Sequence, residues 1–339
     1  MTIFVPGGAG YIGTHVILEL IKQGYHVIAA DNFVNSKPEA IARVRQLSGV
    51  DFPFYEMDIR NSDDLDKVFA THTIECVIHL AGLKAVSESV EDPLKYYANN
   101  LGSTISLLSA MRRHNIRKII FSSSATVYSA DNKMPLTENS LVGDCANPYG
   151  QSKLMCEQII TDCANTHDGW SASLLRYFNP IGAHESGTIG EDPQDIPNNL
   201  MPIISQTAIG KLPYLSVYGD DYETPDGTGI RDYIHVTDLA AGHVATIKHL
   251  DTHSGVCVFN LGTGCGTSVL ELVTAFEDAT GVSIPRQISA RRPGDLPVCV
   301  ADVKKAGREL SWTAKKSLQD ACIDAWRWQS ENPNGYNSP

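Results

Sequence analysis

The chain has 339 residues, enough for about two domains at roughly 150 residues each. Apolar residues make up 42% of the chain and charged residues 19%, which is typical of a folded globular protein and excludes a fibrous or disordered one. The formal net charge of −12 repels nucleic acids and anionic membranes over the general surface. A ligand that carries phosphate must therefore find local positive charge.

No apolar run approaches the roughly 18 residues that span a bilayer, and the first strand begins at Met1 without a basic leader. The eight cysteines form no C-x-x-C pair. This spacing is typical of free thiols in a reducing compartment and not of a disulfide framework or a zinc site. We therefore expect a cytoplasmic protein with no bound metal and with neither nucleic acid nor membrane as a partner.

Short runs rich in β-branched residues alternate with longer stretches of helical spacing. The predicted strands are Ile3–Val5, Val27–Ala30, Val77–Leu80, Lys118–Phe121 and Ser173–Arg176. The predicted helices are Tyr11–Gln23, Pro38–Leu47, Leu65–Phe69 with Ser62–Asp64 as the N-cap segment, Pro93–His114 and Tyr149–Asn165. Strands that alternate with helices predict an α/β fold with a doubly wound parallel (Rossmann) sheet.

This pattern changes near Asn179, beyond which Gly, Pro, Asn and Asp are frequent. We predict a dinucleotide-binding domain over residues 1–178 and a smaller α/β substrate domain over 179–339, with the possibility that the chain crosses between them. A further strand is predicted at Val256–Leu261, and further helices at Ser268–Thr280 and Leu318–Ser330.

A glycine-rich turn, Gly7 to Gly13, fits G-x-G-x-x-G directly after a predicted strand and directly before a predicted helix. Glycines allow the backbone to approach a pyrophosphate, whose charge then lies at the helix N-terminus. Asp31 follows Gly13 by 18 residues and can accept both ribose hydroxyls, which favours NAD over NADP. Alternatively, Asp31 only caps the following loop. Asp58 and Ile59 are weaker candidates for contacts with adenine.

Tyr149 and Lys153 form Y-x-x-x-K, a spacing that places both on one face of a helix. A tyrosine has an ordinary pKa of about 10, so a tyrosine that acts as a base near neutral pH needs positive charge beside it. Lys153 and an oxidised nicotinamide supply such charge. Ser124 ends a predicted strand at the edge of the sheet where ligands bind, and can share a hydrogen bond with substrate and Tyr149.

The chain resembles the UDP-glucose 4-epimerases of the extended short-chain dehydrogenase/reductase superfamily over essentially its whole length. Besides the motifs above, the similar segments include His79–Lys84, Ser122–Tyr128, Leu175–Pro180 and Gly229–Tyr233. The resemblance implies tightly bound NAD, a UDP-sugar substrate and a homodimer. It assigns the cofactor to Gly7, Gly10, Tyr11, Ile12, Gly13, Asp31, Asn32, Asn35, Ser36, Asp58, Ile59, Leu80, Ala81, Lys84, Asn99, Ser122, Tyr149, Lys153, Tyr177 and Phe178. It assigns the nucleotide sugar to Ser124, Asn179, Asn199, Leu200, Ser216, Val217, Tyr218, Arg231, Arg292, Asp295 and Cys299.

The implied reaction is reversible epimerisation at C4 of a UDP-hexose through a 4-keto sugar, with Ser124, Tyr149 and Lys153 as the catalytic residues. A 4,6-dehydratase or a decarboxylase of the same superfamily is the alternative. Both need acidic or basic side chains after Ser124, where this chain has Ala125 and Thr126. An NAD-binding protein without activity would gain nothing from Tyr149 and Lys153.

Cys299 stands where a tyrosine of the resembling family narrows the space beside the hexose C2 group. A smaller side chain leaves room for an acetamido group. We therefore expect UDP-N-acetylhexosamines to be substrates as well. The alternative is that Cys299 is an apolar filler without contact to the sugar.

Overall fold

The computed structural model describes residues 1–166, 169–194, 197, 199–292 and 294–337. Within them, the largest sheet has seven parallel strands in the order β11-β6-β5-β4-β1-β2-β3. These strands are β1 (Thr2–Pro6), β2 (His26–Asp31), β3 (Phe54–Glu56), β4 (Cys76–His79), β5 (Lys118–Ser124), β6 (Ser171–Tyr177) and β11 (Gly255–Leu261). The predicted doubly wound α/β fold is confirmed.

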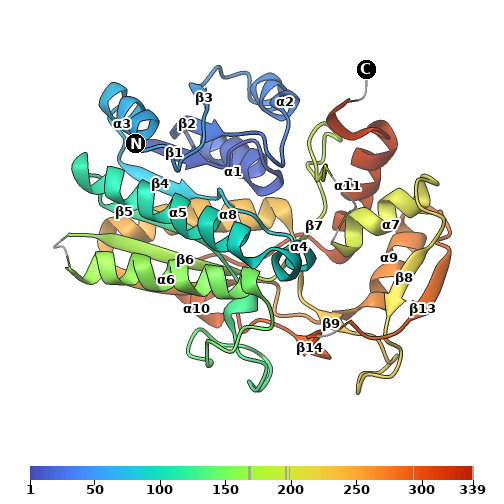
Figure 1. Ribbon diagram of the computed structural model, residues 1–339. Helices are drawn as coiled ribbons and strands as arrows, with labels where there is room; N and C mark the ends of the chain where they lie inside the picture. Colours follow the sequence, from blue (N-terminus) through green and yellow to red (C-terminus); the bar gives the residue numbers. More distant parts are fainter. Residues whose placement is uncertain (167–168, 195–196, 198, 293, 338–339) are drawn as a thin grey trace.

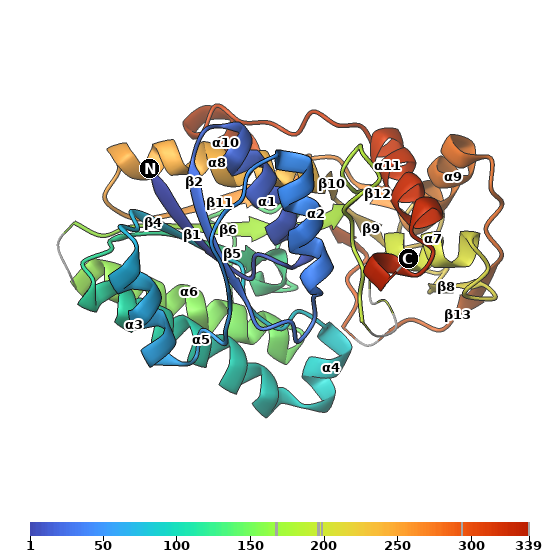
Figure 2. The same ribbon diagram turned by 90° about the horizontal axis from the view of Figure 1, so that it is seen from above.

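Helices cover both faces of this sheet (Figures 1 and 2). One layer contains α1 (Tyr11–Lys22), α2 (Pro38–Ser48) and α8 (Val236–Thr252), and the other contains α3 (Ser62–Thr71), α5 (Pro93–Arg113) and α6 (Pro148–Thr166). Strand β1 shows why the sheet is buried on both sides. Ile3 and Val5 point into the core on the α1 side, whereas Phe4 between them points into the core on the α5 side.

A smaller part packs beside the carboxyl edge of the sheet, on the right in Figure 1. It contains β8 (Leu215–Tyr218), β13 (Arg286–Ser289), α7 (Leu200–Ala208), α9 (Val269–Thr280) and α11 (Leu318–Glu331) around its own core, which includes Ile204, Leu272 and Phe276. Short strands connect it to the large sheet: β7 (Asn179–Ile181), β9 (Ile230–Arg231), β10 (Tyr233–His235), β12 (Thr267–Ser268) and β14 (Val298–Cys299). Helices α4 (Val86–Glu91) and α10 (Lys304–Glu309) lie on the larger part.

Two details differ from the sequence prediction. The N-cap of α3 is Asn61, whose side chain accepts a hydrogen bond from the backbone N–H of Asp63, so the predicted N-cap segment Ser62–Asp64 was wrong and forms the first turn of the helix. The strand predicted at Val256–Leu261 is β11, which pairs with β6 in the large sheet. The chain therefore crosses back from residues 179–339 to the first part, and the division at residue 178 stays a prediction. In the described part of the chain, no helix is long and apolar enough to cross a membrane.

Candidate active site

A cavity of about 350 Å³ lies at the carboxyl edge of the large sheet, where parallel strands of this fold class bind ligands. Its walls contain each residue that the sequence assigns to the cofactor. These are Gly7, Gly10, Tyr11, Ile12, Gly13, Asp31, Asn32, Asn35, Ser36, Asp58, Ile59, Leu80, Ala81, Lys84, Asn99, Ser122, Tyr149, Lys153, Tyr177 and Phe178. The structure thus gathers around one space residues that are spread along the chain from Gly7 to Phe178.

The glycine-rich turn leaves the N-terminus of α1 open toward this cavity. Gly7 has φ +83°, and a Cβ there would collide with the backbone of Ala81. A Cβ on Gly13 would collide with the carbonyl of Gly7, so the turn packs directly on the helix. The N-cap Gly10 makes no side-chain cap, and the first turn of α1 has no acidic residue. Free amides and the helix dipole therefore fit a pyrophosphate at this end.

Asp31 ends β2 beside the turn. Its carboxylate accepts hydrogen bonds from the backbone N–H of Ala9 at 3.0 Å and of Phe33 at 3.0 Å, and from the Ser36 hydroxyl at 2.8 Å. Burial raises the pKa of Asp31, and these hydrogen bonds oppose that rise. Asp31 thus caps its loop and also lines the cavity, so the contact with a ribose stays a prediction. Asp58 is paired with Arg60 at 2.6 Å.

Helix α6 brings Tyr149 and Lys153 to the cavity on one face, as the spacing predicts. The Lys153 ammonium donates to the carbonyl of Ser122 at 2.7 Å and lies 5.9 Å from the centre of the Tyr149 ring. Burial lowers the pKa of Lys153 to about 8. Burial also raises the pKa of Tyr149 to about 12, which a hydrogen bond with Ser124 opposes. In the protein alone, Tyr149 is therefore a neutral phenol whose ionisation needs more positive charge beside it.

The residues assigned to the nucleotide sugar fall into two groups. Ser124, Asn179 and Asn199 line the same cavity as Tyr149. Arg231 and Arg292 lie in the smaller part and share one carboxylate, Asp295, at 3.6 Å and 2.9 Å. The Arg292 guanidinium also covers the ring of Tyr218 at 4.9 Å. With two guanidinium groups to one carboxylate, this second group carries a net positive charge, which suits a diphosphate.

The remaining assigned residues lie nearby, on α7, β8 and β14. Leu200 begins α7 directly after its N-cap Asn199. Ser216 and Val217 lie on β8, where the Val217 side chain is buried in the core of the smaller part and leaves only its backbone for a ligand. Cys299 pairs in register with Arg231 and packs against the apolar cluster that contains Phe178. The Cys299 position thus connects the arginine group with the wall of the cavity.

Glu191 is a residue of this site that the sequence analysis missed. One oxygen of its carboxylate accepts from the Lys84 ammonium at 2.6 Å and from the Asn199 amide at 2.9 Å. The Glu191 side chain is only 10% exposed, and its backbone carbonyl accepts from the Trp328 indole. The Glu191 carboxylate therefore binds both Lys84, which is assigned to the cofactor, and Asn199, which is assigned to the nucleotide sugar. No motif marks Glu191, because the segment around it has no helical or strand periodicity.

Comparisons with known proteins agree with this site. Residues 3–262 match the family described as "NAD dependent epimerase/dehydratase family". The UDP-glucose 4-epimerase of Bacillus subtilis is 55% identical over 100% of this chain and 99% of its own length. The UDP-glucose 4-epimerase of Mus musculus is 52% identical over 99% of both chains. The crystal structure of UDP-glucose 4-epimerase from Bifidobacterium longum in complex with NAD+ and UDP has a TM-score of 0.96 at 53% identity, covering 99% of this chain and 100% of that one.

Proposed function

The chain belongs to the NAD dependent epimerase/dehydratase family, and we propose that it inverts C4 of UDP-hexoses, interconverting UDP-glucose and UDP-galactose. The observation that carries this proposal is the placement of Tyr149, Lys153 and Ser124 in the cavity that the glycine-rich turn also lines. The cofactor is NAD, which, when bound, takes the C4 hydrogen with its electrons and returns it. The residues of the chain position the sugar and move the proton.

Tyr149 removes the proton from O4 as C4 becomes a ketone, and returns it when C4 is reduced from the opposite face. Ser124 is placed to orient O4, because its hydroxyl already meets the Tyr149 hydroxyl. Lys153 supplies a fixed positive charge near the ring of Tyr149 and so favours the phenolate. Between the two half-reactions the 4-keto sugar turns within the cavity and presents its other face.

This chain lacks the acidic and basic side chains that a 4,6-dehydratase or a decarboxylase of the superfamily would need. Ala125 and Thr126 follow Ser124, and neither can serve as the acid or base that elimination or decarboxylation needs. The burial of Lys153 argues against a protein without activity. Burying its ammonium group costs stability, and among the described residues no carboxylate lies within salt-bridge distance to offset that cost. A buried amine of this kind points to use in a reaction.

Substrate range is a finer part of the proposal. We expect UDP-N-acetylglucosamine and UDP-N-acetylgalactosamine to be converted too, because Cys299 occupies little volume where it packs near Phe178. In Cys299→Tyr, activity on the acetamido substrates should fall selectively. Equal loss on both substrate classes, or a wild type that ignores the acetamido substrates, would mean that another wall sets the range.

Assembly and location belong to the proposal as well. We expect a cytoplasmic homodimer formed through α5 and α6. The support is a set of exposed apolar side chains on these helices: Leu94 is 77% exposed, Ile105 50% and Met155 38%. Both helices also pack on each other over the sheet.

Incubation of purified protein with UDP-galactose, without added NAD, tests the proposal. Formation of UDP-glucose alone supports it. Release of water to give a 4-keto-6-deoxy sugar, or release of carbon dioxide in a parallel incubation with a UDP-uronic acid, would support the alternatives instead.

A further inference from the structure

The catalytic cavity has a wall that the sequence analysis did not predict. Residues 190–193 and Tyr336 line the cavity together with Asn35 and Ser36, which are assigned to the cofactor. Residues 190–193 belong to a wall segment, residues 182–194, which follows β7 and passes between α2 and α11 in both views (Figures 1 and 2). The cavity is therefore bounded both by the loop after β2 and by the wall segment, two parts that are far apart in the chain.

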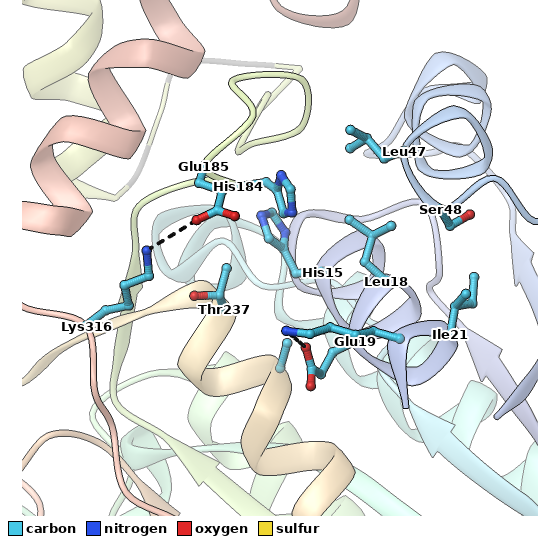
Figure 3. Close-up of a pocket in the computed structure, with 12 residues that line it drawn as sticks. His15, Leu18, Glu19, Ile21, Leu47, Ser48, His184, Glu185, Thr237 and Lys316 are labelled. Atoms are coloured by element: carbon cyan, nitrogen blue, oxygen red, sulfur yellow. Dashed lines mark ion pairs between the residues drawn. The ribbon is translucent and has the colours of Figure 1, made fainter. Parts of the chain in front are cut away.

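The first half of the wall segment lies against α1. The Tyr11 hydroxyl donates to the carbonyl of Gly182 at 2.6 Å. His184 faces His15, with ring centres 6.4 Å apart, as Figure 3 shows. This half borders a second cavity, of about 410 Å³, which shares no lining residue with the catalytic cavity among those described. The contacts with Tyr11 and His15 fix the segment to the helix whose N-terminus is open toward the cofactor.

The second half of the wall segment is supported from behind by residues near the C-terminus. The Tyr336 hydroxyl donates to the Gly190 carbonyl at 3.3 Å, and its backbone N–H donates to the Asp192 carboxylate at 2.9 Å. Gly335 has φ +64°, and a Cβ there would lie 2.0 Å from Asp192. The glycine thus allows the C-terminal residues to pack directly on Asp192, so this carboxylate is held in place.

Helix α2 is fixed to the same part of the molecule. The Arg43 guanidinium donates to the Thr188 carbonyl at 3.0 Å and to the Asn332 side chain at 2.7 Å, and it covers the Tyr336 ring at 5.2 Å. Strand β2, before the loop, pairs on both sides within the sheet. The loop of residues 32–37 is therefore the part of this boundary that can move without unpacking a helix or a strand.

An ion pair connects this loop to the wall segment. The Lys37 ammonium donates to the Asp192 carboxylate at 2.8 Å, and the two side chains are only 20% and 13% exposed. Salt screens such a shielded pair less than one on the open surface. The Gln194 side chain adds a hydrogen bond to the Ser36 carbonyl at 3.0 Å. Lys37 directly follows Ser36, so the ion pair lies at the edge of the cavity that the cofactor residues form.

We propose that Lys37 and Asp192 set the rate at which NAD leaves the protein. Their ion pair holds the loop of residues 32–37 against the wall segment, and NAD is released when the pair opens. The loop then moves away from Asp192, which Tyr336 keeps in place, and takes Asn35 and Ser36 with it. The proposal rests on NAD as the cofactor and not on which sugar nucleotide is converted.

The test measures exchange of bound NAD for an excess of isotopically labelled NAD, by mass spectrometry of the NAD that stays with the purified protein. Lys37→Met removes the charge and keeps the aliphatic stem, and Asp192→Asn keeps an acceptor for Tyr336. Each should speed exchange about tenfold, as expected for the loss of one hydrogen bond between charged groups. The double variant should be no faster than either single variant, because both act through one contact. Lys37→Arg keeps the charge and should exchange as slowly as the wild type.

Lys118→Met is the matched control. It breaks an ion pair of similar length, with Asp251 at 2.6 Å, at the start of β5, and Lys118 does not line the cavity. It should exchange NAD at the wild-type rate. The proposal is overturned if Lys37→Met or Asp192→Asn exchanges NAD at the wild-type rate, if Lys118→Met speeds exchange as much as they do, or if the double variant multiplies the two single effects. The assay contains no sugar nucleotide, so these outcomes are independent of the proposed epimerase activity.

Discussion

At the scale of single residues, the surroundings of Tyr149 explain why its chemistry needs partners. Burial raises its pKa to about 12, and the hydrogen bond with Ser124 opposes the rise only in part. The hydroxyl is therefore useful as a base only beside Lys153 and an oxidised nicotinamide. Under the proposed mechanism, Tyr149 therefore keeps its proton until an oxidised nicotinamide lies beside it.

Tyr149→Phe should lower kcat by about 100-fold or more, because general base catalysis contributes on this order. Tyr214→Phe, which removes a phenol hydroxyl at a position 40% exposed, is the matched control and should leave kcat unchanged. Steady-state kinetics with UDP-galactose check both. A folded Tyr149→Phe enzyme with the kcat of the wild type would remove Tyr149 from the mechanism.

The buried Lys153 should make stability depend on pH. Its pKa is about 8 in the folded protein against an ordinary 10.5, so between these values the unfolded chain holds a proton that the folded chain has released. The contribution of Lys153 to the free energy of unfolding of the cofactor-free protein should therefore rise from pH 8 to 10, and its penalty is fully present below pH 8. Buried thiols such as Cys76 and Cys322, whose pKa burial raises, contribute with the opposite sign, so the test compares variants: in urea unfolding, the stability of wild type relative to Lys153→Met should increase from pH 8 to 10. An increase no larger than that measured relative to the control Lys304→Met, at a side chain 85% exposed, would contradict a lowered pKa.

Glu191 should act as a positioning residue for both ligands. In Glu191→Ala, Lys84 and Asn199 lose their common partner, so KM for UDP-galactose should rise and NAD should dissociate faster, each about tenfold, with kcat changed less. Glu191→Gln keeps an acceptor and should restore most of the affinity. Glu223→Ala removes an exposed carboxylate and serves as the control. Unchanged KM and unchanged NAD release in Glu191→Ala would leave Glu191 without this role.

At the scale of elements, local periodicity predicted α1, α2, α3, α5, α6, α9 and α11, because each of these helices buries one apolar face. Helix α1 runs over Tyr11–Lys22 where residues 11–23 were expected, and α2 ends one residue later than expected. The pattern did not reveal α7 or α8. Most residues of α8 are buried, so the helix has no polar face to set against an apolar one. The six-residue helices α4 and α10 and the two-residue strands β9, β12 and β14 were also missed, because segments this short hold too few residues for a period and strand pairing depends on residues far away in the chain.

Helices α5 and α6 carry the prediction of assembly. Ile105→Glu places a charge on the exposed apolar surface of α5 and should convert a dimer into monomers, because an unpaired charge is costly in an apolar interface. Light scattering at micromolar concentration measures the mass. Val50→Glu, at an exposed residue after α2, is the control. A wild type of monomer mass would contradict the dimer itself, and an Ile105→Glu variant of dimer mass would move the interface elsewhere.

At the scale of the whole molecule, the cofactor half of the site was accessible from sequence and the sugar half only in part. The residues around Gly7, Asp31, Ser124 and Tyr149 all follow parallel strands or begin the helices after them. One rule therefore predicts them together, namely that ligands of doubly wound folds bind at the carboxyl edge of the sheet. Arg231 and Arg292 meet at Asp295 across loops, which no periodicity predicts. The family resemblance alone assigned these arginines to the nucleotide sugar, and the structure shows the ion pairs with Asp295 that position them.

The most direct test of the central claim is a single incubation of the purified protein, without added NAD, in which sugar nucleotides and NADH are measured together over many turnovers. Because the C4 hydrogen is removed and returned at one site, UDP-galactose should be converted to UDP-glucose until equilibrium, while absorbance from NADH stays constant. Reduction of the bound NAD to one NADH per site, after which conversion stops, or no conversion by protein that retains NAD, would contradict the proposed epimerase.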